Sequence, residues 1–346
     1  MDWPALFSQY EAQLEDFWGR RQNRPVYSRE FTVFGHLVRI VSNFQDVLAS
    51  AGFAQPLYSL APEIDAPPFI IQLIVRSVPK VTSPLPENLF DHTQYSGHAD
   101  WLAIQLGSWG HCQVDLAGKQ ALAVLAPELA ERPALVSRYL LNTIITNFLI
   151  ARGYGFLHTT GLLKERQVLL LLARHNSGKS TAALQLALAG YQLLSDSMIF
   201  VDPQGPPLRL YGFPVGRIKL RPDMVADFPQ LEPLLEAEPV RGEIKYTADL
   251  RQLDPALVHE AVVEPLVVHL CLLTLGDEPT THLRPASISE VMEKVMANSL
   301  YYDTARVWKQ NLACIQPLVE QAHCYHLQVG SDPAGLMATI DDLWSS

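Results

Sequence analysis

The spacing of apolar and polar residues changes along the chain. In the first part, segments with a helical period occur together with apolar runs that predict strands. Residues 5–20 have a helical period that places Leu6, Tyr10, Leu14 and Trp18 on one face, and a short helix is expected over 44–52. A long apolar helix is expected over 132–152. Stretches rich in Pro, Ser and Gly over 53–66 and 78–100 are expected to be irregular. Apolar runs predict strands over 31–42, 69–77, 100–107, 111–116 and 121–127, with a hairpin between the last two.

From about residue 153, short apolar runs alternate with helical periods. The runs predict strands over 156–158, 167–173, 191–196, 197–202, 265–275 and 323–329. The helical periods predict helices over 179–189, 287–298, 304–321 and 332–344. Such alternation is typical of an α/β domain. We therefore expect a mixed α+β N-terminal domain over residues 1–130 and an α/β domain over residues 131–346.

The composition indicates a folded cytoplasmic protein. With 48% hydrophobic and 18% charged residues the chain can bury a large core. Its formal charge of -10 disfavours binding to nucleic-acid phosphates. The N-terminus lacks the basic start and apolar stretch of a signal peptide, and no uninterrupted apolar run reaches about 18 residues, so we expect no membrane insertion.

The four cysteines are scattered along the sequence, as expected in a reducing compartment. Cys324 lies near His323 and His326, which raises the question of a metal site. The spacing fits no zinc pattern. We favour a reduced core thiol and two strand-edge histidines.

A phosphate loop is predicted between the strand over 167–173 and the helix over 179–189. Backbone N–H groups of such a loop and the start of the helix bind phosphate oxygens. Lys179 is expected to reach the outer phosphates, and the Ser180 hydroxyl to ligate Mg²⁺. We predict an ATP site with Mg²⁺, and a fortuitous turn is the alternative. The loop has the Walker A pattern with Ala at the first Gly position, and it reads Ala173, Arg174, His175, Asn176, Ser177, Gly178, Lys179, Ser180, Thr181.

Asp196 ends the next apolar run, 17 residues after Lys179. If that run lies beside 167–173, the carboxylate sits at the same edge of the sheet as the loop. There Asp196 can bind Mg²⁺ together with Ser180, or take the proton from an attacking hydroxyl. The alternative is an Asp that caps a turn.

Basic residues follow in two places. Arg217, Lys219 and Arg221 alternate, so they share one face of a strand and form either a phosphate-facing patch or a solvated edge. We favour the patch. Arg241 and Lys245 are weaker candidates of the same kind.

These segments resemble HPr kinase/phosphorylase and its wider group of related bacterial kinases. The resemblance is specific over roughly 153–223, through FLHTTGLL (156–163), ARHNSGKST and GYQLLSDS (190–197), and GRIKLRPD (216–223) is similar to the basic stretch of related kinases. It implies a P-loop fold related to phosphoenolpyruvate carboxykinase, with a separate N-terminal domain. His158 lies 15 residues before Ala173, which fits the histidine of the family. The resemblance implies contact of His158 with phosphate or substrate, while a hydrogen-bonded structural histidine is the alternative.

Asp196 falls on the first residue of the family's Asp pair, which acts as base toward a substrate serine. Three positions depart from the family pattern. Ala173 and Asn176 stand where glycine is usual, and Ser197 stands where the second Asp is expected. The acidic signature of true HPr kinases is not found downstream, so HPr itself is a poor candidate for the substrate.

The sequence therefore predicts an ATP-dependent kinase that transfers the γ-phosphate to a Ser or Thr hydroxyl of a protein or peptide. The catalytic residues would be Asp196, Lys179 and His158. The alternatives are a nucleotide-binding regulator without phosphotransfer and a kinase for a small molecule. Members of the resembled family often assemble, so a homo-oligomer is among the expectations.

Overall fold

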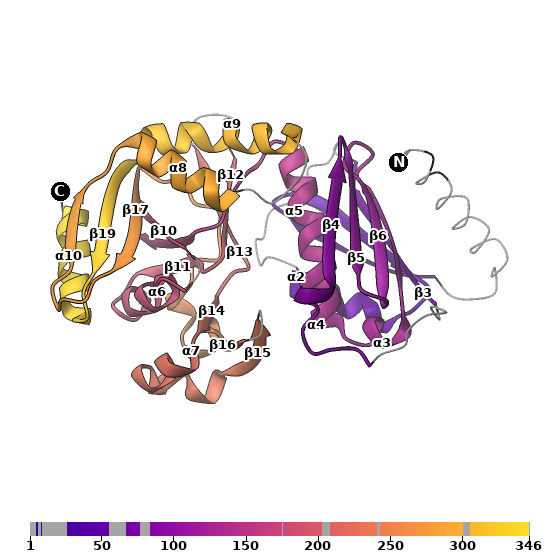
Figure 1. Ribbon diagram of the computed structural model, residues 1–346, viewed down its shortest axis with the longest axis horizontal. Helices are drawn as coiled ribbons and strands as arrows, with labels where there is room; N and C mark the ends of the chain where they lie inside the picture. The colour runs from indigo at the N-terminus through magenta and orange to yellow at the C-terminus, as the bar shows by residue number, and fades with distance from the viewer. Residues whose placement is uncertain are drawn as a thin grey trace. The chain divides into compact units, whose positions relative to one another are not determined.

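The computed structural model describes residues 26–54, 67–76, 84–174, 176–202, 208–240, 243–299 and 305–345, together with Ala5 and Ser8. The expected helix over 5–20 lies almost wholly outside these residues, as do His175 and Arg241. The described chain divides into two compact units (Figure 1). Unit 1 extends to Arg152 and includes 305–307, and unit 2 comprises the rest from Gly153. This division falls at the end of the long helix, next to residue 153 where the sequence pattern changes, whereas the predicted boundary was 130/131.

Unit 1 is built on a seven-stranded mixed sheet. Strands β2 and β3, and β3 and β7, pair in parallel, while the other neighbours are antiparallel. The strands, in spatial order, are β1 (Tyr27–Val33), β2 (His36–Ser42), β3 (Phe69–Val75), β7 (Gln120–Leu125), β6 (Gly110–Asp115), β5 (Trp101–Leu106) and β4 (Thr93–His98).

Helices gather on one face of this sheet (Figure 1). The long segment from Pro133 to Ala151 begins as α4 (Pro133–Val136), passes through a π-helical stretch η3 (Ser137–Leu141) and continues as α5 (Asn142–Ala151). The ring of Phe148 packs against that of Phe69, with centroids 4.9 Å apart. The shorter helices are η1 (Asp46–Ala49), α2 (Ser50–Ala54), η2 (Phe90–His92) and α3 (Pro127–Ala130).

The segment Pro133–Ala151 passes a length and composition test for a membrane span, the one helix among the described residues to do so. However, 72% of its apolar window is buried inside the protein. This is the behaviour of a core helix that covers an apolar sheet face.

Two expectations for unit 1 are corrected. The apolar stretch 31–42 is a hairpin, not one strand, because Phe34 and Gly35 both have left-handed backbones (φ 51° and 85°) and turn the chain. The stretch 78–100, expected to be irregular, contains the edge strand β4. The expected hairpin between β6 and β7 is present.

Unit 2 is a mixed α/β structure around a six-stranded sheet. Strand β10 (Gln167–Leu172) is central, antiparallel to β9 (Thr160–Lys164) on one side and parallel to β17 (Val267–Leu275) on the other. Five of the six side chains of β10 are buried, and only that of Gln167 is partly exposed. The remaining strands are β11 (Gln192–Ser195) beyond β9, and β19 (His323–Val329) and β18 (His282–Pro285) beyond β17.

Helices cover both faces of this sheet. One face packs Val168, Leu170 and Leu172 with apolar residues of α8 (Ile288–Ser299) and α9 (Ala305–Gln321). Helix α6 (Lys179–Leu188) and helix α10 (Pro333–Ser345) lie on the other side (Figure 1). Because successive strand side chains point to opposite faces, the apolar run Val168–Leu172 of β10 requires cover on both sides.

Two three-stranded sheets complete unit 2. One has the order β13 (Arg209–Phe213), β12 (Met198–Asp202), β8 (Gly155–Leu157). The other has the order β14 (Arg217–Leu220), β16 (Glu243–Asp249), β15 (Glu236–Val240). The short helices are η4 (Pro222–Asp227), η5 (Pro229–Leu234), α7 (Leu250–Leu253) and η6 (Pro255–Leu257).

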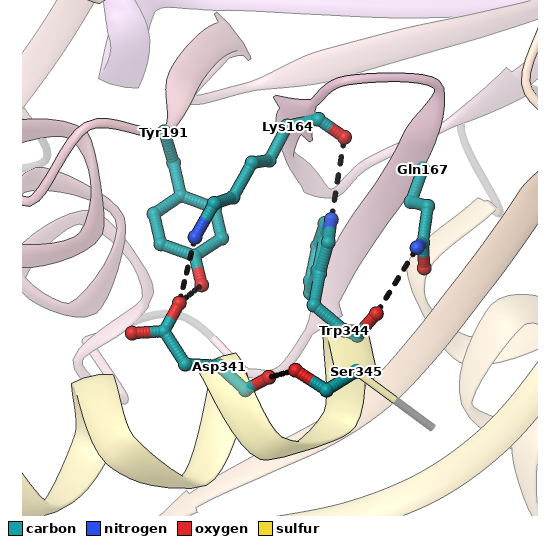
Figure 2. Close-up of polar contacts among 6 residues, drawn as sticks. All are labelled: Lys164, Gln167, Tyr191, Asp341, Trp344 and Ser345. Atoms are coloured by element: carbon teal, nitrogen blue, oxygen red, sulfur yellow. Dashed lines mark hydrogen bonds and ion pairs between the residues drawn. The ribbon is translucent and has the colours of Figure 1, made fainter.

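Helix α10 is attached by polar contacts to the turn between β9 and β10 (Figure 2). Asp341 accepts hydrogen bonds from Lys164 Nζ (2.7 Å) and from the Tyr191 hydroxyl (2.6 Å). The Trp344 indole donates to the Lys164 carbonyl (3.2 Å), and Gln167 Nε2 donates to the Trp344 carbonyl (3.2 Å). These contacts hold the C-terminal helix at the amino end of β10, opposite the loop that follows the strand.

Candidate active site

Two described residues of the loop after β10 have left-handed backbones. Asn176 (φ 59°) and Gly178 (φ 86°) are both left-handed, which Asn tolerates best among residues with a side chain. Helix α6 then begins at Lys179. The dipole of this ten-residue helix places a partial positive charge at its N-terminus, next to the loop. The 173–181 loop therefore brings backbone N–H groups and a helix start to the carboxyl end of a buried strand.

Lys179 is folded back onto the loop. Its ammonium group donates to the carbonyls of Ala173 (2.8 Å) and Arg174 (2.9 Å). Burial lowers the pKa of Lys179, an effect that Asp196 opposes and Lys245 reinforces. An anion in the loop would offer the ammonium group a stronger partner than these carbonyls.

Asp196 lies at the same edge of the sheet as the loop, but its strand is not adjacent to β10. Strand β9 lies between them, antiparallel to both, so β11 and β10 run in the same direction. The inserted strand contributes Thr160, whose hydroxyl donates to Asp196 Oδ1 (3.0 Å). The Lys219 backbone N–H donates to Oδ2 (3.1 Å), and the Ser180 hydroxyl also donates to this carboxylate.

The Asp196 carboxylate is buried, and burial raises its pKa although the hydrogen bonds from Ser180, Lys219 and Thr160 act in the opposite direction. A raised pKa makes a carboxylate a stronger base. The contact with Ser180 joins Asp196 to the first turn of α6. Two expected Mg²⁺ ligands are thus brought together.

Lys245 joins this group from β16. Its ammonium group donates to Asn176 Oδ1 (2.8 Å), and Asn176 Nδ2 contacts Glu243 (3.4 Å). Burial lowers the pKa of Lys245; Glu243 and Asp196 raise it, and Lys219 and Arg221 lower it further. The sequence indicates Lys245 only weakly as a phosphate-binding residue, and no sequence pattern points to Thr160.

The predicted basic face of 217–221 is formed in part. Arg217 and Lys219 alternate with buried Ile218 and Leu220 along β14. Lys219 interacts with Asp196 and Lys245. Arg217 interacts instead with Asp249. Arg221 follows the strand and forms an exposed ion pair with Asp223 (2.8 Å).

His158 directly follows β8 and is half-buried. It lies in the short connection between β8 and β9, two residues before Thr160, which donates to Asp196. Its contact with a phosphate or a substrate stays a prediction.

Within the described ranges, no three His, Cys, Asp or Glu side chains lie close enough to hold a metal ion. His326 contacts Glu290 (3.0 Å), and Cys324 lies against backbone carbonyls of Val319 and Ala322. Mg²⁺ is usually bound through one or two carboxylates together with substrate phosphates. The pair of Ser180 and Asp196 fits that smaller requirement.

Comparisons with known proteins add little. No family model matches the sequence, and no curated protein matches it. Among solved structures, similarity is found to the Hpr(Ser) kinase/phosphatase from Coxiella burnetii, at 13% sequence identity and a TM-score of 0.29. The match covers 55% of this chain and 92% of that chain. Because this TM-score is low, the likeness decides neither the fold nor the function.

Proposed function

We propose that the chain is an ATP-dependent kinase that transfers the γ-phosphate to a Ser or Thr hydroxyl of a protein or peptide. One observation carries the proposal: the buried carboxylate of Asp196 is hydrogen-bonded to Ser180, in the first turn of the helix that follows the 173–181 loop. A phosphate site and a candidate base thus share one contact. In-line transfer requires little more than positioning and charge neutralisation.

The charge of the site supports a polyanionic ligand. Lys179, Lys219 and Lys245 outnumber the two carboxylates that interact with them, Asp196 and Glu243. Lys245 lowers the pKa of Lys179, and Lys219 lowers the pKa of Lys245. Like charges in a partly buried site repel one another. A triphosphate would offset this repulsion, with Lys179 and the loop N–H groups on its phosphates.

Ser180 and Asp196 would hold Mg²⁺, which neutralises phosphate charge when bound. The carboxylate of Asp196 would accept the proton of the acceptor hydroxyl. Thr160 and the Lys219 backbone hold that carboxylate in place. The choice of a protein or peptide acceptor follows the sequence resemblance to HPr-kinase-related enzymes.

The test uses γ-labelled ATP and Mg²⁺ with the purified protein and a dialysed extract of its host. Lys179→Ala and Asp196→Asn are compared with Lys309→Ala and Asp91→Asn, which change exposed residues elsewhere. We expect a labelled protein or peptide with the wild type and both controls. We expect none with Lys179→Ala or Asp196→Asn, although Asp196→Asn still binds ATP. Full labelling by Asp196→Asn would remove Asp196 from the mechanism.

A second candidate function is a nucleotide-binding regulator that transfers no phosphate. It is favoured by the state of Asp196, since both carboxylate oxygens already accept hydrogen bonds and Ser197 supplies no second carboxylate. ATP binding that Lys179→Ala abolishes, without any labelled acceptor, would support this function over the kinase.

A further inference from the structure

Strand β4 (Thr93–His98) is the last strand of the unit 1 sheet, and among the described strands it pairs with β5 alone (Figure 1). Four of its six residues are exposed to solvent, and the other two are half-buried. A strand at the edge of a sheet presents backbone groups to which a further strand can bind.

The backbone of β4 faces β5 and the open edge in alternation. The pairing with β5 is antiparallel, and the Gly107 N–H donates to the His92 carbonyl (2.8 Å) in continuation of the same register. In an antiparallel pair, residues that bond to the neighbouring strand alternate with residues that do not. Positions 94, 96 and 98 therefore bond to β5 as His92 does. The N–H and C=O groups of Thr93, Tyr95 and Gly97 point away from β5.

The composition of β4 differs from that of other edge strands in this protein. Edge strands usually carry charged residues or proline, which discourage pairing with another chain. At the opposite edge of the same sheet β1 has Arg29 and Glu30, and at an edge of the six-stranded sheet β18 has Arg284 and Pro285. The sequence of β4, TQYSGH, contains no Asp, Glu, Lys, Arg or Pro.

Aromatic side chains are exposed at the same edge. Tyr95 is 42% exposed, and Phe90, in η2 directly before β4, is 43% exposed. The Tyr95 hydroxyl lies 3.4 Å from Thr143 Oγ1 in α5. Among the described residues of unit 1, the other large apolar side chain with such exposure is Val26, which precedes β1 at the far edge. Exposed aromatic rings beside a strand edge without charge indicate a protein interface.

The edge is complementary to a second copy of itself. In an antiparallel pairing centred on Tyr95, this residue lies opposite its equivalent in the second copy. Thr93 then lies opposite Gly97, and Gln94 opposite Ser96. The residues whose backbone groups point outward meet as hydrogen-bonded pairs, and no like charges face each other along the strand.

We propose that unit 1 binds a second copy of the chain through β4, antiparallel and centred on Tyr95, so that the sheets of two copies become continuous. Such a contact uses the same edge of both copies and is therefore closed at two chains. The pairing does not depend on the phosphate site or on the proposed function.

The test measures the mass of the full chain by light scattering after gel filtration, over a range of protein concentrations. Tyr95→Lys and Tyr95→Glu each place like charges opposite one another at the centre of the pairing. Gln105→Lys, at an exposed position of β5 in the same sheet, is the matched control. Circular dichroism of each variant is compared with that of the wild type to show that it is folded.

We expect the wild type and Gln105→Lys to have the same mass, of at least two chains, and each Tyr95 variant to have half of it. A mixture of Tyr95→Lys and Tyr95→Glu should recover the wild-type mass, because opposite charges then face each other. The proposal is overturned by a wild type that is a single chain at every concentration, by Tyr95 variants that keep the wild-type mass, or by folded variants that fail to combine.

Tyr95→Cys gives a second readout that introduces no charge. Opposite residues in a hydrogen-bonded antiparallel pair have Cα atoms about 5.5 Å apart, which a disulfide can bridge. Oxidised glutathione should therefore link two copies of Tyr95→Cys, and it should link Gln105→Cys and the wild type far more slowly. Equal rates for Tyr95→Cys and Gln105→Cys would show that β4 is not the contact.

Discussion

Acidification should destabilise unit 2 through His269, a histidine in β17 that is only 4% exposed. Its Nε2 lies 2.9 Å from Gln167 Oε1. Gln167 Nε2 donates to the Trp344 carbonyl (Figure 2). Gln167 Oε1 is therefore the acceptor toward His269, whose proton is on Nε2. Nδ1 is buried and has no hydrogen-bond partner within the described protein. Protonation would place a second N–H where no acceptor is available.

The size of the effect follows from the pKa. Burial, with a smaller contribution from His323, lowers the pKa of His269 from 6.5 to about 4. Above about pH 6.5 the residue is neutral in the folded and the unfolded chain. Below this pH the unfolded chain binds a proton that the folded chain does not, so stability falls until the pH reaches about 4. At about 1.4 kcal/mol for each unit, the full loss is about 3 kcal/mol.

The assay is urea unfolding between pH 7.5 and pH 4.5, together with hydrogen exchange of residues 333–345 in α10. The His269→Gln variant keeps a group that can donate to Gln167 and cannot be protonated, so its stability should fall less with acid than that of the wild type. His282→Gln, which changes a 57% exposed side chain, should follow the wild type. The reasoning is refuted if His269→Gln loses stability as steeply as the wild type, or if NMR titration gives His269 an ordinary pKa.

Three further predictions concern the core and the site. Thr160→Val removes the hydrogen bond to buried Asp196 and should cost about 1–3 kcal/mol in urea unfolding at pH 7, with Asp91→Asn unchanged. Lys245→Met removes one cation and its hydrogen bond to Asn176, and it should weaken tripolyphosphate binding about tenfold at low salt, whereas the control Lys309→Met should not. If Lys245→Met binds tripolyphosphate as tightly as the wild type, Lys245 is not part of the phosphate site. Leu170→Ala opens a cavity at a fully buried position and should cost about 2–5 kcal/mol, whereas Leu266→Ala, at a 70% exposed position, should cost less than about 0.5 kcal/mol.

The apolar strands of unit 2 were predictable because burial sets their pattern. β10 and β17 are buried along most of their length, and β19 is buried at Leu327 and Val329. All three differ from the predicted ranges by at most two residues at an end. Strand β4 could not be predicted, because it has no such burial pattern. It pairs with β5 alone, at the edge of its sheet, and none of its residues is fully buried. An edge strand needs no apolar pattern, so composition alone indicated a loop.

The local parts of the site could be predicted, and the non-local ones could not. Lys179 and Ser180 follow from the loop motif, and Asp196 follows from its place at the end of the next strand in the chain. Lys245 is 66 residues beyond Lys179, and it reaches Asn176 only because β16 pairs with β14. Thr160 reaches Asp196 because β9 is inserted between β10 and β11, and no sequence period reports that insertion.

Ser197 changes the charge balance of the site more than its shape. Its N–H donates to the Ser195 hydroxyl (3.2 Å), which in turn donates to the Phe213 carbonyl (3.0 Å), so position 197 is part of the turn that links β11 to β12. A second carboxylate there would stand next to Asp196, whose pKa burial already raises, and would raise it further by repulsion. With Ser at position 197, Lys179, Lys219 and Lys245 outnumber Asp196 and Glu243, the two carboxylates that interact with them. We therefore expect the lysines to contribute more, and the metal less, to phosphate binding than in a site with an Asp at position 197.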